Sequence, residues 1–145
     1  MTTRRGTPAD VERIVTMGSR FVGETTYRAL ITPNPQQMTQ TVSALMSNDS
    51  GCVFVGESHS ELVGMIGMVM FTHHVSGDRI AGEVFWWVEP EHRGGGVKLL
   101  KAAERWAKEQ QAQGIQMIAP TPEVGQLYAR LGYAPVETTY QRALV

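Results

Sequence analysis

The chain has 145 residues, of which 42% are hydrophobic and 19% charged, and its formal net charge is −1. This length suits one domain with its own core, so we expect a single domain over residues 1–145. The charge pattern, without a basic run or an interleaved aromatic stripe, excludes a nucleic-acid surface. No apolar run approaches the roughly 18 residues of a membrane span, and the first residues lack a secretory signal, so we expect no membrane partner and a cytoplasmic location.

A first helix is expected near the N-terminus. Thr7 is a suitable N-cap, Pro8 suits the first helical position, and Asp10 stands in the capping-box position. The apolar residues that follow share one helical face, so the helix should end near Gly18 or run on to Val22.

A second helix is expected between Thr32 and Asn48. Its apolar residues recur at helical spacing, and they are Met38, Val42, Leu45 and Met46. The segment between the two helices, Gly23 to Ile31, has no clear period. We interpret it as a crossover that faces a substrate, because loops often carry function.

Three strand-like runs come next, separated by short polar turns: Cys52–Glu57, Leu62–Phe71 and Ile80–Val88. Short connections between strands predict an antiparallel meander. Cys52 is the only cysteine, which excludes an internal disulfide, and we interpret it as a buried strand residue.

The pattern changes to a helical period over residues 97–113, and Gly114 suits the end of that helix. The apolar run 115–118 predicts a strand parallel to the one before the helix. Residues 124–131 predict a short helix, and residues 133–145 should supply one or two terminal strands. The expected fold class is therefore α+β, with a mixed, mostly antiparallel sheet flanked by about four helices.

The most informative segment joins the last meander strand to the long helix and reads Arg93-Gly94-Gly95-Gly96-Val97-Lys98. Glycines let backbone N–H groups converge, and the first turn of a helix adds unpaired donors and a partial positive charge. This pattern is typical of a phosphate-binding turn, and a tight turn without a ligand is the alternative. It matches neither the P-loop nor the dinucleotide motif Gly-x-Gly-x-x-Gly, whose last place is Leu99 here.

Two motifs, in this order, resemble the signatures of the GNAT N-acetyltransferases. The run Val88-x-Pro90-x-x-Arg93-Gly94-x-Gly96-Val97 is similar to the family's Gln/Arg-x-x-Gly-x-Gly/Ala, which cradles acetyl-CoA pyrophosphate. Downstream, Leu127-Tyr128-Ala129-Arg130-Leu131-Gly132-Tyr133 resembles Leu-Tyr-x-x-x-Gly-Phe/Tyr. The resemblance spans nearly the whole chain, and small bacterial and phage members carry a similar Phe-Trp-Trp-Val-Glu-Pro run. It departs at Lys98, where the family usually has Gly or Ala.

The resemblance implies the GNAT fold, with acetyl-CoA as cosubstrate. The matching strand positions, which would pair with the pantetheine arm, are Trp86, Trp87 and Val88. The matching turn positions, which would hold the pyrophosphate, are Arg93, Gly94, Gly95, Gly96, Val97, Lys98 and Leu99. To admit the arm, this strand must splay from the strand at 115–118, and Trp86 and Trp87 should project to opposite sheet faces.

N-acyl transfer needs an amine without its proton, a polarised carbonyl and a proton for the leaving thiolate. Tyr128 matches the family tyrosine near the coenzyme sulfur, which implies a general acid; packing of its ring is the alternative. Glu83 is the first candidate base, because some family members use a glutamate on this strand. Its register falls one residue away, which would reverse the side-chain face. Glu123, His73, His74 and a water chain are the other candidates.

We expect no metal, because adjacent extended residues such as His73 and His74 point apart and no further ligands stand at metal-site spacing. The leading function is an acyl-CoA-dependent N-acetyltransferase for an amine on a small molecule or a protein. Specificity is expected from residues 23–47 and 73–79. The alternatives are a non-catalytic acyl-CoA-binding or regulatory module and a nucleotide-binding module. The sequence decides neither the acceptor nor the acyl chain nor the assembly, a homodimer included.

Overall fold

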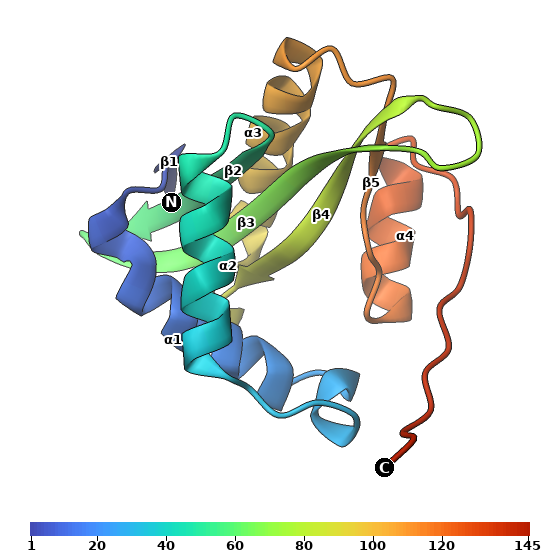
Figure 1. Cartoon of the computed structure of the whole chain (residues 1–145). Helices are drawn as coiled ribbons and strands as arrows, with labels where there is room; N and C mark the ends of the chain where they lie inside the picture. The colour runs from blue at the N-terminus through green and yellow to red at the C-terminus, as the bar shows by residue number, and fades with distance from the viewer.

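The structure is a computed structural model that describes all of residues 1–145. Five strands form one sheet in the order β1-β2-β3-β4-β5, and four helices pack around it (Figure 1). The elements in chain order are β1 (Thr2–Arg5), α1 (Val11–Gly23), α2 (Pro35–Ser47), β2 (Gly51–Ser58), β3 (Glu61–Thr72), β4 (Arg79–Val88), α3 (Gly96–Glu109), β5 (Gly114–Gln116) and α4 (Pro122–Arg130). Short 3₁₀ turns lie at Pro8–Asp10, Thr26–Ala29 and Pro90–Gly95.

The sheet is mixed, as the sequence predicted. Strands β1 to β4 pair antiparallel with their neighbours, and β4 pairs parallel with β5. The parallel pairing is short: Ile80 to Gly82 of β4 face Gly114 to Gln116 of β5. From Glu83 to Val88, β4 continues with no partner on that side, so the two strands part in the middle of the molecule.

Each face of the sheet carries its own core. Helices α1 and α2 cover one face, with Ile14, Met17 and Val42 among its fully buried residues. Helix α3 covers the other face through the predicted apolar positions Leu99, Leu100, Ala103, Trp106 and Ala107, all buried (Figure 1). Cys52 and the methionines of β3 at 65, 68 and 70 are buried as well, as expected.

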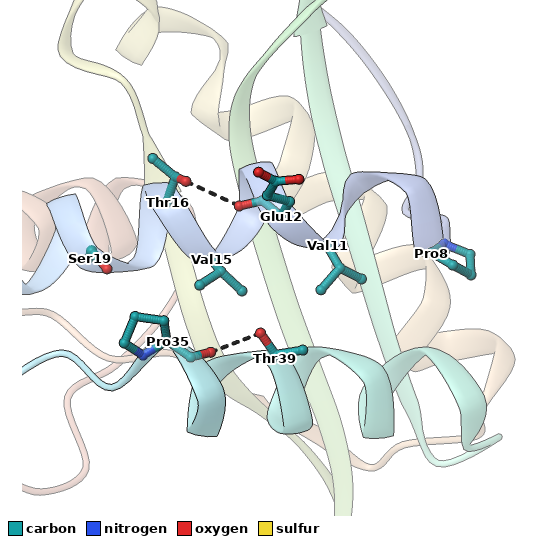
Figure 2. A pocket seen from close by; sticks show the side chains of 8 residues that line it. All are labelled: Pro8, Val11, Glu12, Val15, Thr16, Ser19, Pro35 and Thr39. Carbon is teal, nitrogen blue, oxygen red and sulfur yellow. Dashed lines mark hydrogen bonds between the residues drawn. The ribbon is translucent and has the colours of Figure 1, made fainter.

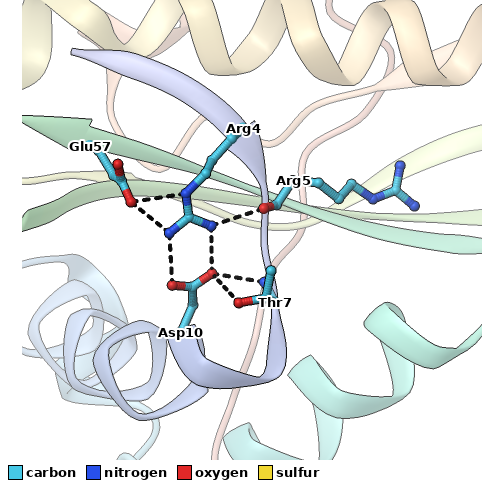
Figure 3. A network of polar contacts seen from close by, with 5 residues as sticks. All are labelled: Arg4, Arg5, Thr7, Asp10 and Glu57. Carbon is cyan, nitrogen blue, oxygen red and sulfur yellow. Dashed lines mark hydrogen bonds and ion pairs between the residues drawn. The ribbon is translucent and has the colours of Figure 1, made fainter. Parts of the chain in front are cut away.

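The start of α1 is held by the predicted capping residue. Asp10 accepts hydrogen bonds from the Thr7 backbone N–H at 2.8 Å and from two nitrogens of Arg4 (Figure 3). Arg4 also donates to Glu57 of β2, so this cluster joins β1, β2 and α1. The Arg4 guanidinium is the main cause that lowers the Asp10 pKa to about 2.

The observed elements differ from the expected ones in three places. Residues 133–145 form no strand and run beside α4 to a free end (Figure 1). Val136, Tyr140 and Leu144 there are 77%, 91% and 84% exposed, and a strand needs both a partner edge and a buried face. β1 was missed, because its polar residues Thr2 to Arg5 show no apolar alternation.

The third difference concerns the end of α3. The helix ends at Glu109, and Gln111, with φ of 60°, takes the left-handed turn that was expected at Gly114. Gly114 instead opens β5. No helix of the chain is both long and apolar enough to cross a membrane.

Candidate active site

A cavity of about 490 Å³ lies where β4 and β5 part. One wall is the unpaired half of β4, and the opposite wall comes from the segment after β5 and from α4, through Ile118, Pro120, Thr121, Val124 and Leu127. At one end lie Arg93, Gly96 and Val97 at the start of α3. The strand edge and the helix start that the sequence singled out therefore face one space.

A β-bulge in β4 decides which side chains face this space. Gly67 of β3 pairs with Phe85, and Met68 pairs with Glu83, so Val84 is the extra residue. Because of this extra residue, the side chains after Val84 project to the opposite sheet faces from those of an uninterrupted strand. Trp87 packs in the core under α1 and α2, and Trp86 packs against the core under α3. The expected opposite projection of the two tryptophans is confirmed. Both line the cavity.

Glu83 lies in the cavity wall and spans the gap between the parted strands. Its Oε1 accepts a hydrogen bond from the Ile118 backbone N–H at 3.1 Å and a longer one from the Tyr128 hydroxyl at 3.4 Å. Burial disfavours its charge and raises the pKa of Glu83 to about 7, even though both hydrogen bonds act in the opposite direction. A carboxyl group with this pKa exchanges protons near neutral pH.

Tyr128 lies beside Glu83 but is not part of the cavity wall. Its hydroxyl donates to the Ile118 carbonyl oxygen at 2.8 Å, and its ring packs between Trp86 and Tyr133. The side chain is 6% exposed. Burial, together with the nearby charge of Glu83, raises the pKa of Tyr128, so its proton is retained at neutral pH.

The glycine turn is a 3₁₀ turn that leads directly into α3. The Gly96 N–H donates to the Arg93 carbonyl, so one of the donors expected to be free is used within the turn. Space is open around Gly94, where an added Cβ would meet no atom within 4 Å. At Gly96 a Cβ would lie 3.4 Å from both Trp86 and Val88, in ordinary van der Waals contact with the strand.

The remaining turn residues point in different directions. Arg93 lines the cavity, with its guanidinium 4.9 Å from the centre of the Trp87 ring and its Nε donating to the Val88 carbonyl. Lys98 donates to the Met1 carbonyl oxygen at 3.0 Å and does not reach the cavity. Leu99 is fully buried in the core under α3, and Gly95 packs against Met1.

The other candidate bases lie away from the cavity. Glu123 is exposed in the first turn of α4. His73 and His74 lie beyond the end of β3, and their rings stack with centroids 5.1 Å apart. The expectation that they point apart was wrong, because they belong to a turn and not to an extended segment. The chain holds no group of three or more His, Cys, Asp or Glu side chains that could hold a metal ion.

Sequence reasoning missed the residues at the far end of the cavity. They come from the end of α1 and the segment after it, and they are Phe21, Glu24, Thr25, Tyr27 and Ile31. The segment was expected to face a substrate, but no period in it indicated which side chains do so. The second expected specificity segment, residues 73–79, does not reach the cavity.

A buried carboxylate, Glu89, was also missed. It is 3% exposed, directly follows β4, and forms ion pairs with Arg13 at 3.1 Å and with Arg20, both of α1. Its backbone N–H donates to the Val63 carbonyl. Glu89 therefore connects α1, whose end lines the far end of the cavity, to β4, which forms one of the cavity walls.

A second hollow, of about 640 Å³, lies between α1 and the start of α2 (Figure 2). The hydroxyls of Thr16 and Thr39 there donate to carbonyls of their own helices. This surface offers few polar groups free to bind a ligand, and none of the candidate site residues from the sequence lies on it.

Solved structures with the same fold cover nearly the whole chain. A transcriptional regulator from Bacillus halodurans C-125 has a TM-score of 0.80 at 20% identity, with 99% of each chain covered. A predicted acetyltransferase from Clostridium acetobutylicum, solved with acetyl-CoA, has 0.78 at 17% identity, covering 99% of this chain and 96% of that one. The aminoglycoside 6'-N-acetyltransferase AAC(6')-IG from Acinetobacter haemolyticus has 0.73 at 17% identity, covering 99% and 97%.

At these identities the structural likeness establishes the fold alone. A search of curated protein sequences found no match. The family model described as "Acetyltransferase (GNAT) family" matches residues 21–133, a range that contains the cavity wall, the glycine turn and Tyr128. With the parted strands and both signature segments in place, the chain belongs to the GNAT acetyltransferase family.

Proposed function

We propose that this chain is an N-acetyltransferase that moves an acetyl group from acetyl-CoA to a primary amine. The observation that carries the proposal is the cavity between the parted β4 and β5, which ends at the start of α3. An extended arm fits a strand edge with unpaired backbone groups, and a pyrophosphate fits the N-terminus of a helix.

In this proposal the turn and the strand edge hold different parts of acetyl-CoA. Backbone N–H groups of Gly94, Gly95 and Val97 bind the pyrophosphate, with the partial positive charge of α3 behind them, while the Gly96 N–H stays bonded to the Arg93 carbonyl. The backbone of Trp86, Trp87 and Val88 pairs with the pantetheine arm. Lys98 contributes through its backbone N–H, because its side chain is engaged elsewhere, and Leu99 supports the turn through its buried side chain.

The reaction needs two proton movements. The amine nitrogen attacks the thioester carbonyl, a C–N bond forms, the C–S bond breaks, and the amine loses a proton while the thiolate gains one. We assign the base to Glu83, which lines the cavity and has a pKa of about 7. We assign the acid to Tyr128, whose hydroxyl leaves the Ile118 carbonyl in that step.

A non-catalytic acyl-CoA-binding module is the second candidate. One observation favours it: the Tyr128 hydroxyl is bonded to the Ile118 carbonyl and is not in the cavity wall. Such a module would keep the glycine turn and bind the coenzyme without turnover.

Calorimetric titration with acetyl-CoA, with CoA and ATP alongside, tests the shared part of both candidates. Micromolar binding of acetyl-CoA supports the proposed coenzyme site at the glycine turn and the edge of β4. Turnover with a panel of amines then distinguishes an enzyme from a binding module. No binding by a folded sample, or tighter binding of ATP, overturns the proposal.

A further inference from the structure

The cavity has a second end, and its lining differs from that of the glycine-turn end. Phe21, Tyr27 and Ile31 line it, together with Trp87. These side chains come from the end of α1, from the segment that directly follows it and from β4. Because the coenzyme would fill the end near α3, this end is the space for the acceptor.

The aromatic side chains here form one connected wall. The rings of Phe21 and Tyr27 lie 5.5 Å apart at 53°, and those of Phe21 and Trp87 lie 6.0 Å apart at 66°. Edge-on pairs of this kind are favourable and present both ring faces and ring edges to a neighbour. The arrangement suits an apolar body, above all an aromatic one.

The charged groups along the cavity wall leave one carboxylate for a cation. Glu24 and Glu83 are the acidic residues that line the cavity. Glu24 already pairs with Arg20 at 3.4 Å, and Arg20 also pairs with the buried Glu89. Arg93, over the Trp87 ring, adds a positive charge to the wall. A further ammonium group on the acceptor would therefore find only Glu24, which is already paired with Arg20, and the positive charge of Arg93, so the cost of removing it from water would be poorly compensated.

From this wall and this charge balance we infer that the acceptor is a small monoamine with an aromatic body, not a polyamine, an aminoglycoside or a protein lysine. The inference rests on the proposed function, since it describes the acceptor end of the same cavity. The amine points toward Glu83, and the ring of the acceptor packs on Phe21, Tyr27 and Ile31.

The test measures kcat/KM for 2-phenylethylamine, spermidine, kanamycin and a lysine-containing peptide, with acetyl-CoA binding measured separately by calorimetry. We expect 2-phenylethylamine to exceed each of the others by roughly tenfold or more, as an apolar pocket with one carboxylate requires. Quenching of tryptophan fluorescence by 2-phenylethylamine gives a second readout that needs no turnover.

A pair of neighbouring residues supplies a matched control. Ile31 and Leu30 are each 43% exposed, but Ile31 alone lines the cavity. Ile31→Ala should raise the KM for 2-phenylethylamine roughly fivefold, and Leu30→Ala should leave it unchanged. Tyr27→Ala should raise it further, with the Kd for acetyl-CoA unaltered.

The outcomes separate a wrong acceptor from a wrong proposed function. If acetyl-CoA binds but spermidine, kanamycin or the peptide is preferred, the inference is wrong and the proposed function stands. The same holds if acetyl-CoA binds and 2-phenylethylamine neither quenches fluorescence nor reacts. If acetyl-CoA itself does not bind, the proposed function fails and the inference fails with it.

Discussion

Glu83 and Ile118 are joined by a hydrogen bond, at 3.1 Å, between a side-chain oxygen and a backbone N–H on opposite sides of the gap between β4 and β5. This bond closes the inner end of the cavity just beyond the last backbone pair of the two strands, Gly82 with Gln116. A carboxylate in that place bears both on catalysis and on the stability of the fold.

Catalysis should depend on the ionisation of Glu83. Because its pKa is about 7, the protonated form prevails at lower pH and cannot accept a proton from the amine. We expect kcat/KM to rise with pH through about 7 and then to level off until another group titrates. Glu83→Gln should remove this limb and lower kcat roughly a hundredfold.

The control for this variant is its structure. The glutamine oxygen can still accept from the Ile118 N–H, so the near-UV circular dichroism and the Kd for acetyl-CoA should stay unchanged. An unaltered pH profile in Glu83→Gln would assign the base to another group or to water.

The stability of the fold should also depend on the ionisation of Glu83. Catalysis needs the ionised form, whereas the fold is more stable with the protonated form. The fold raises the pKa of Glu83 from an ordinary value of 4.5 to about 7, so it favours the protonated form. This contribution is complete below pH 4.5 and is lost as pH rises through 7. Glu83→Gln should therefore raise the free energy of unfolding at pH 8 by about 1–3 kcal/mol and change it little at pH 4.5. Urea denaturation at both pH values measures this, and an equal effect at both would contradict it.

The glycine turn is best tested at Gly94. Gly94→Glu adds a negative charge where space is open, and Gly94→Ala adds only a methyl group. We expect Gly94→Glu to weaken acetyl-CoA binding by roughly tenfold or more through repulsion of the pyrophosphate, and Gly94→Ala to have little effect. Calorimetry measures both. Gly96→Glu is a less selective change, because its side chain would press on Trp86 and Val88.

Tyr128→Phe should lower turnover more than coenzyme binding. The ring can keep its packing against Trp86 and Tyr133, while the proton donor is lost. The Ile118 carbonyl also loses its partner, so a stability loss of about 1 kcal/mol is expected. Turnover equal to that of the parent chain would show that Tyr128 is not the acid and would favour a packing role.

Asp10 should be among the more costly polar residues to replace. It is 8% exposed and pairs with Arg4 through both carboxylate oxygens, whereas Glu57 pairs with the same arginine from a more exposed position (Figure 3). Asp10→Ala should lower the free energy of unfolding by about 2–4 kcal/mol, and Glu57→Gln by less than about 1 kcal/mol. Thermal denaturation of the two variants compares them. The pKa of Asp10 is lowered to about 2, so its contribution is present above pH 3.8 and is lost as pH falls toward 2.

The sequence by itself determined most of the local structure. Residues Thr7, Pro8 and Asp10 begin the first helix, and apolar periodicity sets the three long strands and α3. The run from Arg93 to Lys98 identifies a helix-start turn because glycine and helix-start chemistry act over a few neighbouring residues.

Only the tertiary structure decided which side chains meet. The bulge at Val84 sets the face of Glu83, and it depends on the pairing of β4 with β3, which no local period reveals. Phe21 reaches Trp87 through packing of α1 across the sheet, and Tyr27, in the turn after α1, packs on Phe21. Strand propensity in residues 133–145 did not produce a strand, because local preference forms a sheet only where a partner edge and a covering layer are present.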